Sequence, residues 1–90
     1  MAERASSPAS IARRATVELS ELVGREPEGV VALDRTDDGW RVCVEMLELR
    51  RVPDTADLLA EYEVDVDEDG ELVGYRRTRR YARGQGKDGA

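Results

Sequence analysis

Four residues in the second half of the chain have the spacing of a calcium-binding loop. The D-x-D-x-D-G opening of such a loop occurs at Asp65, Asp67, Asp69 and Gly70, where alternate carboxylates would ligate the ion and the glycine would allow a sharp turn. The match fails at the twelfth position, where Arg76 replaces the bidentate glutamate. The flanking residues also alternate like strands rather than helices. The sequence therefore predicts an acidic β-turn here and no metal site.

A run rich in arginine and tyrosine follows this turn and is the second candidate site. Its candidate partner-binding residues are Tyr75, Arg76, Arg77, Arg79, Arg80 and Tyr81. Guanidinium groups can hold phosphates while tyrosine rings stack on bases, as in proteins that bind single-stranded nucleic acid. Arginine and tyrosine are also enriched at protein interfaces. Three interpretations stay open: nucleic-acid binding, a solvated strand of ion pairs, and docking to another protein.

The charge balance argues against nucleic acid as the partner. The chain carries a formal net charge of −6 at pH 7 and has a pI near 4.7, whereas binding to phosphates requires a basic surface. The preceding strand-like segment offers Glu61, Glu63 and Asp65, which we expect to pair with arginines across a hairpin and to neutralise much of their field. Such exposed pairs favour strand register more than stability.

The residues needed for catalysis are largely missing. Histidine is absent and Cys43 is the only cysteine, which excludes an intrachain disulfide, a Cys/His zinc site and a histidine-dependent triad. Carboxylates are abundant, but an acid–base pair needs an apolar pocket that shifts a pKa, and aromatics are only 4% of the chain. The sequence has no phosphate-binding glycine loop and no nucleophile elbow. It predicts a protein that is not an enzyme and uses no cofactor.

Length and hydropathy predict one small domain in the cytoplasm. Ninety residues suffice for a single modest core. No apolar run approaches the ~20 residues of a membrane span, and the first residues lack the hydrophobic core of a signal peptide.

The clearest helical pattern spans residues 8–23. Ser7 can cap the first free amides, Pro8 fits the first helical position, and Gly24 can close the helix in a left-handed conformation. The apolar residues that recur on one stripe are Ile11, Ala15, Leu19, Leu22 and Val23. We expect this stripe to pack on a sheet; docking into the groove of a partner is the alternative, and it requires a free stripe.

Four segments have the alternation or the β-branched composition of strands, at about 30–36, 40–49, 59–67 and 71–82. The turn signals Asp37-Asp38-Gly39 and Asp67–Gly70 join them into two hairpins. Trp40, Val42, Val44 and Met46 share the face that should meet the helix. The phase breaks at residues 47–49, where we expect a bulge or the end of the strand.

The predicted fold class is α+β, with one N-terminal helix packed on a four-stranded antiparallel β-meander. Residues 8–83 form the single domain. Residues 1–7 are predicted to be a disordered lead and residues 84–90 a disordered tail.

With these segments in place, the chain resembles the gas vesicle synthesis protein O family, GvpO. The segments that carry the resemblance are Gly24–Val30, Asp38–Val42, Glu48–Asp54, Leu59–Val64, Asp69–Gly70, Gly74–Arg77 and Arg80-Tyr81. They are collinear and extend over nearly all of the chain from the helix to the tail, although no single segment is a catalytic signature.

The resemblance implies a non-enzymatic accessory protein for building the gas-filled protein shells that give cells buoyancy. It implies a cytoplasmic location, with association to the vesicle as a possibility, and partners among the other gas vesicle proteins. Two alternatives are a nucleic-acid-binding regulator of the gas vesicle gene cluster and a minor structural component of the vesicle. The oligomeric state is left open.

Overall fold

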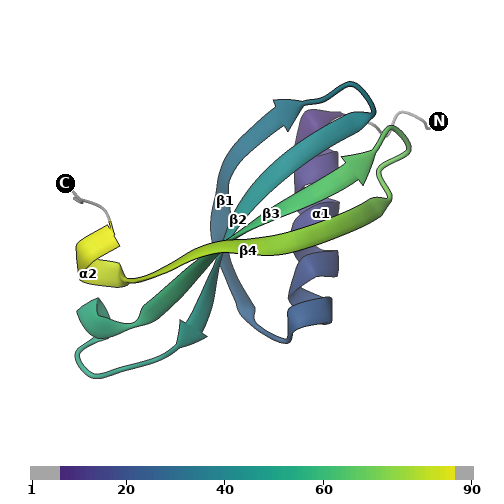
Figure 1. Cartoon of the computed structure of the whole chain (residues 1–90). Helices are drawn as coiled ribbons and strands as arrows, with labels where there is room; N and C mark the ends of the chain where they lie inside the picture. The colour runs from purple at the N-terminus through teal and green to yellow at the C-terminus, as the bar shows by residue number, and fades with distance from the viewer. Residues whose placement is uncertain (1–6, 87–90) are drawn as a thin grey trace.

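The computed structural model describes residues 7–86, which form one long helix and one four-stranded sheet (Figure 1). The elements in chain order are α1 (Pro8–Val23), β1 (Glu26–Arg35), β2 (Gly39–Leu49), the 3-10 helix η1 (Asp54–Ala56), β3 (Leu58–Asp67), β4 (Leu72–Ala82) and α2 (Arg83–Gly86). The strand order is β1-β2-β3-β4 and every neighbouring pair is antiparallel. The predicted α+β class and its meander are confirmed.

Local capping defines α1. The Ser7 Oγ accepts a hydrogen bond from the Ser10 amide at 3.1 Å, and Pro8 occupies the first turn. At the other end Gly24 adopts φ 70° and donates its N–H to the Ser20 carbonyl at 2.8 Å. A side chain with a Cβ is strained at this φ, which favours glycine.

The buried face of α1 differs slightly from the predicted stripe. Ile11, Ala12, Ala15 and Leu19 are buried, whereas Leu22 is 58% exposed. At 100° per residue, Leu22 projects between Ile11 and Ala15, so its exposure comes from its position in the last turn of α1 and not from the side of the helix that it occupies. Because the stripe packs on the sheet, the alternative that it docks into a partner is wrong.

The core lies between α1 and the two central strands. Val42, Val44, Met46 and Val64 are fully buried together with Leu19 of the helix. They face one another because β2 and β3 pair without a shift from Gly39 opposite Asp67 to Leu47 opposite Leu59. Trp40 belongs to the same face but is only half-buried and packs at the rim of the core.

The predicted bulge in β2 occurs between Leu47 and Leu49. Alternation from Met46 places Glu48 on the side of the sheet that carries α1 and Leu47 on the other side, and the extra residue changes the phase only after Glu48. Both leucines of the Leu47–Leu59 pair are buried without contributing to the helix-side core.

The first strand and the C-terminal segment differ from the prediction. β1 starts at Glu26 rather than at residue 30, because a register shift between Pro27 and Gly29 accommodates proline on an edge strand. Residues 84–86, predicted to be the start of a tail, form α2, which begins where the Arg83 amide donates to the Asp57 carbonyl at 2.8 Å. Predicted disorder at 1–6 and 87–90 lies outside the described residues.

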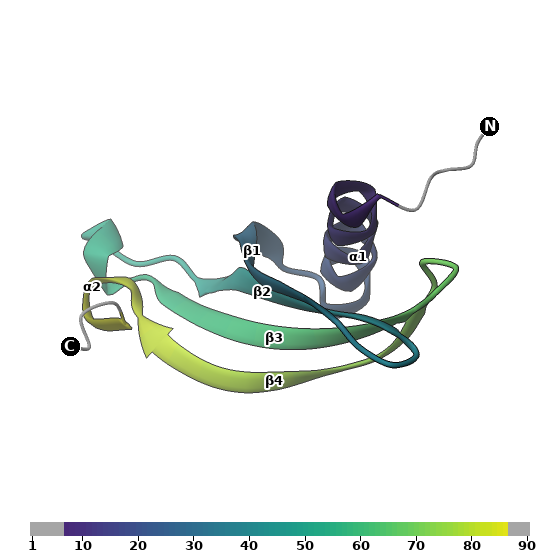
Figure 2. The same ribbon diagram turned by 90° about the horizontal axis from the view of Figure 1, so that it is seen from above.

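The sheet has one covered face and one uncovered face. α1 lies across one side only (Figure 2), and we call this side, which carries Val42 and Val44, the helix-side face. The opposite side, which carries Arg41, Cys43 and Glu45, is the open face. No helix within residues 7–86 is long and apolar enough to cross a membrane.

Candidate protein-docking surface on the last strand

The candidate residues lie on β4, which forms one edge of the sheet. Two shifts interrupt its pairing with β3, at Val73 and at Thr78. The Thr78 hydroxyl donates to the Glu61 carbonyl at 3.1 Å, which holds the extra residue in place. Strand alternation divides the arginine–tyrosine run between the two faces of the sheet, and the shift at Thr78 decides which residues on either side of it share a face.

Arg76, Arg79 and Tyr81 lie on the open face. The Arg76 Nη1 is 2.8 Å from Glu63 Oε1, and the Arg79 Nε is 3.3 Å from Glu61 Oε1. The Arg79 guanidinium also stacks 4.4 Å from the centre of the Tyr81 ring. These contacts are the cross-strand ion pairs predicted from the sequence, and they neutralise this half of the basic run.

Tyr75, Arg77 and Arg80 lie on the helix-side face, in the part nearest the sheet edge. Here both arginines contact a single carboxylate: the Arg80 Nε is 3.1 Å from Glu48 Oε1 and the Arg77 Nη1 is 3.5 Å from Glu48 Oε2. The Glu48 side chain is only 7% exposed, whereas each arginine side chain is about half exposed. Two guanidinium groups on one carboxylate leave a positive charge in excess at this position.

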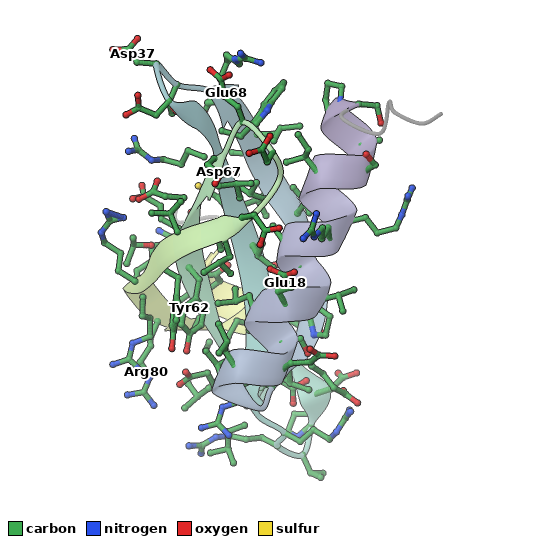
Figure 3. The ribbon with its side chains drawn as sticks, turned by 90° about the vertical axis from the view of Figure 1, so that its right-hand side faces the viewer. Glu18, Asp37, Tyr62, Asp67, Glu68 and Arg80 are labelled. Atoms are coloured by element: carbon green, nitrogen blue, oxygen red, sulfur yellow. The ribbon has the colours of Figure 1, made fainter. Side chains whose placement is uncertain are left out.

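Two tyrosines border this group. The Tyr62 hydroxyl donates to Glu48 Oε2 at 3.4 Å, and burial, followed by the nearby Glu48 charge, raises the pKa of Tyr62. The phenol therefore remains a hydrogen-bond donor at neutral pH. Its ring lies 6.3 Å from that of Tyr75, which is exposed. Figure 3 shows Tyr62 between Arg80 and Glu18 of α1. We call Tyr75, Arg77 and Arg80 the β4 docking surface.

Sequence reasoning missed the role of Glu48. The sequence indicated that arginines of the run would pair with carboxylates of the third strand and left open which ones, whereas Arg77 reaches over β3 to Glu48 in β2. Arg77 pairs with Tyr62 on the helix-side face, and the shift at Thr78 places Arg80 on that face as well. The break of alternation at residues 47–49 was the only signal in the sequence that this region of β2 was unusual.

A second group of charges secures the chain near its C-terminal end. The Arg83 Nη2 is 3.0 Å from Asp57 Oδ2 and its Nη1 is 3.0 Å from Glu28 Oε1. Asp57 is buried and also accepts the Arg51 amide at 2.8 Å. The Arg51 N–H first, and the Arg83 guanidinium second, lower the pKa of Asp57 despite its burial. We interpret this group as a clamp that joins β1, the start of α2 and the segment around η1.

In the acidic turn between β3 and β4, a carboxylate of the turn itself accepts hydrogen bonds from the backbone. Asp67 Oδ1 accepts the amides of Asp69 and Glu71, each at 2.9 Å, and residues 68–71 form the loop between the strands. Within residues 7–86, no three acidic, histidine or cysteine side chains are arranged to hold a metal ion.

Comparison with known proteins gives a consistent family. The family model described as gas vesicle synthesis protein GvpO matches residues 1–87. The gas vesicle protein O of Streptomyces sp. (strain CB03234) is 55% identical over 83 residues, which cover 92% of this chain and 65% of that protein. The gas vesicle protein O1 of Halobacterium salinarum is 37% identical over 75 residues, covering 83% and 63%.

The gas vesicle protein O of Haloferax mediterranei is 40% identical over 76 residues, covering 83% of this chain and 54% of that protein. The chain thus spans less than two thirds of the length of each of these relatives. No solved structure matches the chain.

Proposed function

This chain belongs to the gas vesicle synthesis protein O family, and we propose on that premise that it is a cytoplasmic, non-enzymatic accessory protein for gas vesicle formation. It acts by binding another gas vesicle protein during shell assembly. The binding site is the β4 docking surface.

One observation supports this location of the site above the others. Arg77 and Arg80 share Glu48, so one positive charge is not neutralised, and both side chains stay half exposed. Exposed Tyr75 adds a large amphipathic side chain beside them. Arginine and tyrosine contribute strongly to protein interfaces. The partner that fits is a segment with a carboxylate next to an apolar side chain.

The edge position of β4 adds a second mode of contact. An edge strand presents backbone N–H and C=O groups that can pair with a strand of another protein. β4 runs over eleven residues, so a partner strand could align beside the arginines. Backbone pairing would supply affinity, and the side chains at Tyr75, Arg77 and Arg80 would supply specificity.

The same observations favour docking over phosphate binding. The four arginines of the run all have carboxylate partners within the chain: Glu63 and Asp65 for Arg76, Glu48 for Arg77 and Arg80, and Glu61 for Arg79. Nucleic acid would have to compete with these pairs at a net charge of −6. A titration of labelled RNA against salt tests this alternative, because phosphate binding weakens steeply as salt rises.

The test of the function itself is genetic. Cells that express a complete gas vesicle gene cluster are compared by electron microscopy with and without this reading frame, with the frame restored in trans as the control. Loss of vesicles that is rescued in trans is the expected result. Normal vesicles without the frame would contradict the proposal. Vesicle-bound protein that survives washing would instead support a structural component.

The site is tested with variants that separate binding from folding. The double variant Arg77→Gln/Arg80→Gln removes the docking cations and both ion pairs to Glu48. Glu48→Gln removes the same ion pairs but keeps the cations. We expect vesicles to be lost with the double variant and retained with Glu48→Gln. Equal loss in both would show that the ion pairs act only on stability. Arg13→Gln, at an exposed position of α1, is the control.

A further inference from the structure

The open face of the sheet contains a second candidate site. A hollow of about 420 Å³ crosses all four strands there. Its apolar lining includes Val31 of β1, Leu59 of β3 and Tyr81 of β4, and its charged lining consists of Glu45, Glu61, Arg79 and Arg83. The hollow lies away from the β4 docking surface, which faces the other side of the sheet.

The carboxylate of Glu45 has no partner among the charges of this hollow. Glu45 of β2 is directly opposite Glu61 of β3, and like charges in this position destabilise a sheet. On its other side Glu45 is paired with Gly29 of β1, which has no side chain. Glu61 has Arg79 as its partner, but within residues 7–86 the structure gives Glu45 no ion pair or hydrogen bond through its side chain.

The arginines nearby are already committed to other groups. Arg79 is held between Glu61 and the ring of Tyr81. Arg83 is held by Asp57 and Glu28 in the clamp. Neither can pair with Glu45 without losing contacts that it already has. Within the described residues Glu45 is therefore left without a cationic partner.

The apolar side chains in the hollow indicate what kind of partner would bind there. Val31 is 52% exposed and Tyr81 is half-buried, so apolar side chains line the same hollow as the unpaired carboxylate. α1 covers only the helix-side face (Figure 2), and a sheet face with apolar side chains is commonly covered by a helix.

We propose that this hollow binds an amphipathic helix of another gas vesicle protein, whose apolar side chains contact Val31 and Tyr81 and whose Lys or Arg pairs with Glu45. The inference rests on the proposed function for the choice of partner proteins. It adds a second binding face whose binding charge is negative, whereas that of the β4 docking surface is positive. One chain could then connect two components of the assembly.

The test uses peptides of about 18 residues, or five helical turns, that tile the other gas vesicle proteins of the same organism. Each labelled peptide is titrated with the full chain and followed by fluorescence anisotropy. We expect a peptide with a central Lys or Arg to bind and Glu45→Gln to weaken it about tenfold, which corresponds to 1.4 kcal/mol. Replacing the basic residue of the peptide with Gln should weaken binding equally, and combining both changes should add little.

Two variants control for folding and for general charge effects. Glu45→Gln removes a like-charge pair, so its melting temperature should equal or exceed that of the parent. Glu21→Gln removes an exposed carboxylate of α1 and should leave binding unchanged. Val31→Ser should weaken the same peptide, because it removes apolar contact area at an exposed position.

Three results would overturn the inference. The first is that no peptide binds, and the second is that peptides bind Glu45→Gln with the same affinity as the parent. The third is that light scattering finds dimers of the chain and that Glu45→Gln dissociates them. That result would assign the hollow to a second copy of the chain. Glu45-dependent peptide binding together with normal vesicles in cells lacking the frame would leave the site intact and contradict only the proposed function.

Discussion

The Nε of Arg80 in β4 lies 3.1 Å from Oε1 of Glu48 in β2, although β3 separates the two strands. The side chain can cross β3 because its partner there is the small residue Ala60. The contact joins the edge strand to the interior of the sheet on the helix-side face.

Substitutions of the two residues in this contact should lower the free energy of unfolding by unequal amounts. Glu48→Gln should lower the free energy of unfolding by about 1 to 3 kcal/mol, because the nearly buried carboxylate accepts hydrogen bonds from Tyr62 and Arg77 and also forms an ion pair with Arg80. Arg80→Gln should cost less than about 1 kcal/mol, because Arg77 remains and the side chain is half exposed. Urea unfolding followed by Trp40 fluorescence measures both. Losses no larger than that of Arg13→Gln would contradict a structural role for the contact.

Asp57 should make the stability of the folded chain depend on pH in the acid range. Its pKa is lowered in the folded chain, so its contribution is present above the unfolded pKa of about 3.9 and is lost as pH falls through the folded pKa. Asp57→Asn should be less stable than the parent at pH 7 and should lose less stability on acidification. Thermal melts between about pH 7 and pH 3 compare the two, with Glu21→Gln as the matched control. Parallel pH profiles for parent and Asp57→Asn would rule out this role.

Gly39 should not tolerate alanine. A Cβ at this position would overlap the Val66 carbonyl oxygen and the backbone of Asp67, which cannot move without opening the β2–β3 pairing. Gly39→Ala should cost about 1 to 3 kcal/mol or more. Gly74→Ala is the control, since a Cβ there has nothing within 4 Å. Equal melting temperatures for the two variants would show that the strands adjust.

Trp40 should contribute to stability from the rim of the core. It packs against the core while the Arg35 guanidinium lies 4.8 Å from its ring centre. Trp40→Ala should cost about 3 kcal/mol, at the lower end of the range for truncating a buried aromatic, whereas Trp40→Phe should cost less. Circular dichroism melts test both variants. An unchanged melt for Trp40→Ala would assign the ring to binding instead.

The thiol of Cys43 should react slowly with alkylating reagents. Burial first, and the charge of Glu63 second, raise its pKa, so little thiolate forms at neutral pH. Alkylation by iodoacetamide should be slower than for a free cysteine, and its pH–rate profile should be displaced to higher pH. Glu63→Gln should move the profile back toward lower pH. A rate equal to that of a free cysteine at pH 7 would contradict this account.

The sequence by itself determined the elements and their order. Ser7, Pro8 and Gly24 act within a few residues of themselves, so the bounds of α1 could be predicted from local chemistry. The alternation in β2 and β3 identified the face that carries Val42 and Val44, because side chains in a strand alternate with a fixed period of two. Two turn signals then made the meander the expected topology.

Only the tertiary structure decided which side chains meet. Arg77 and Arg80 share a face because of the shift at Thr78, and the opposition of Glu45 and Glu61 depends on the register of β2 against β3. The clamp of Asp57 and Arg83 joins residues far apart in sequence. One inserted residue exchanges the two faces of a strand beyond it. The local sequence does not specify at which position of the strand pairing this residue is inserted. The partners of the charged side chains, and with them both candidate sites, therefore follow from the register of the folded sheet.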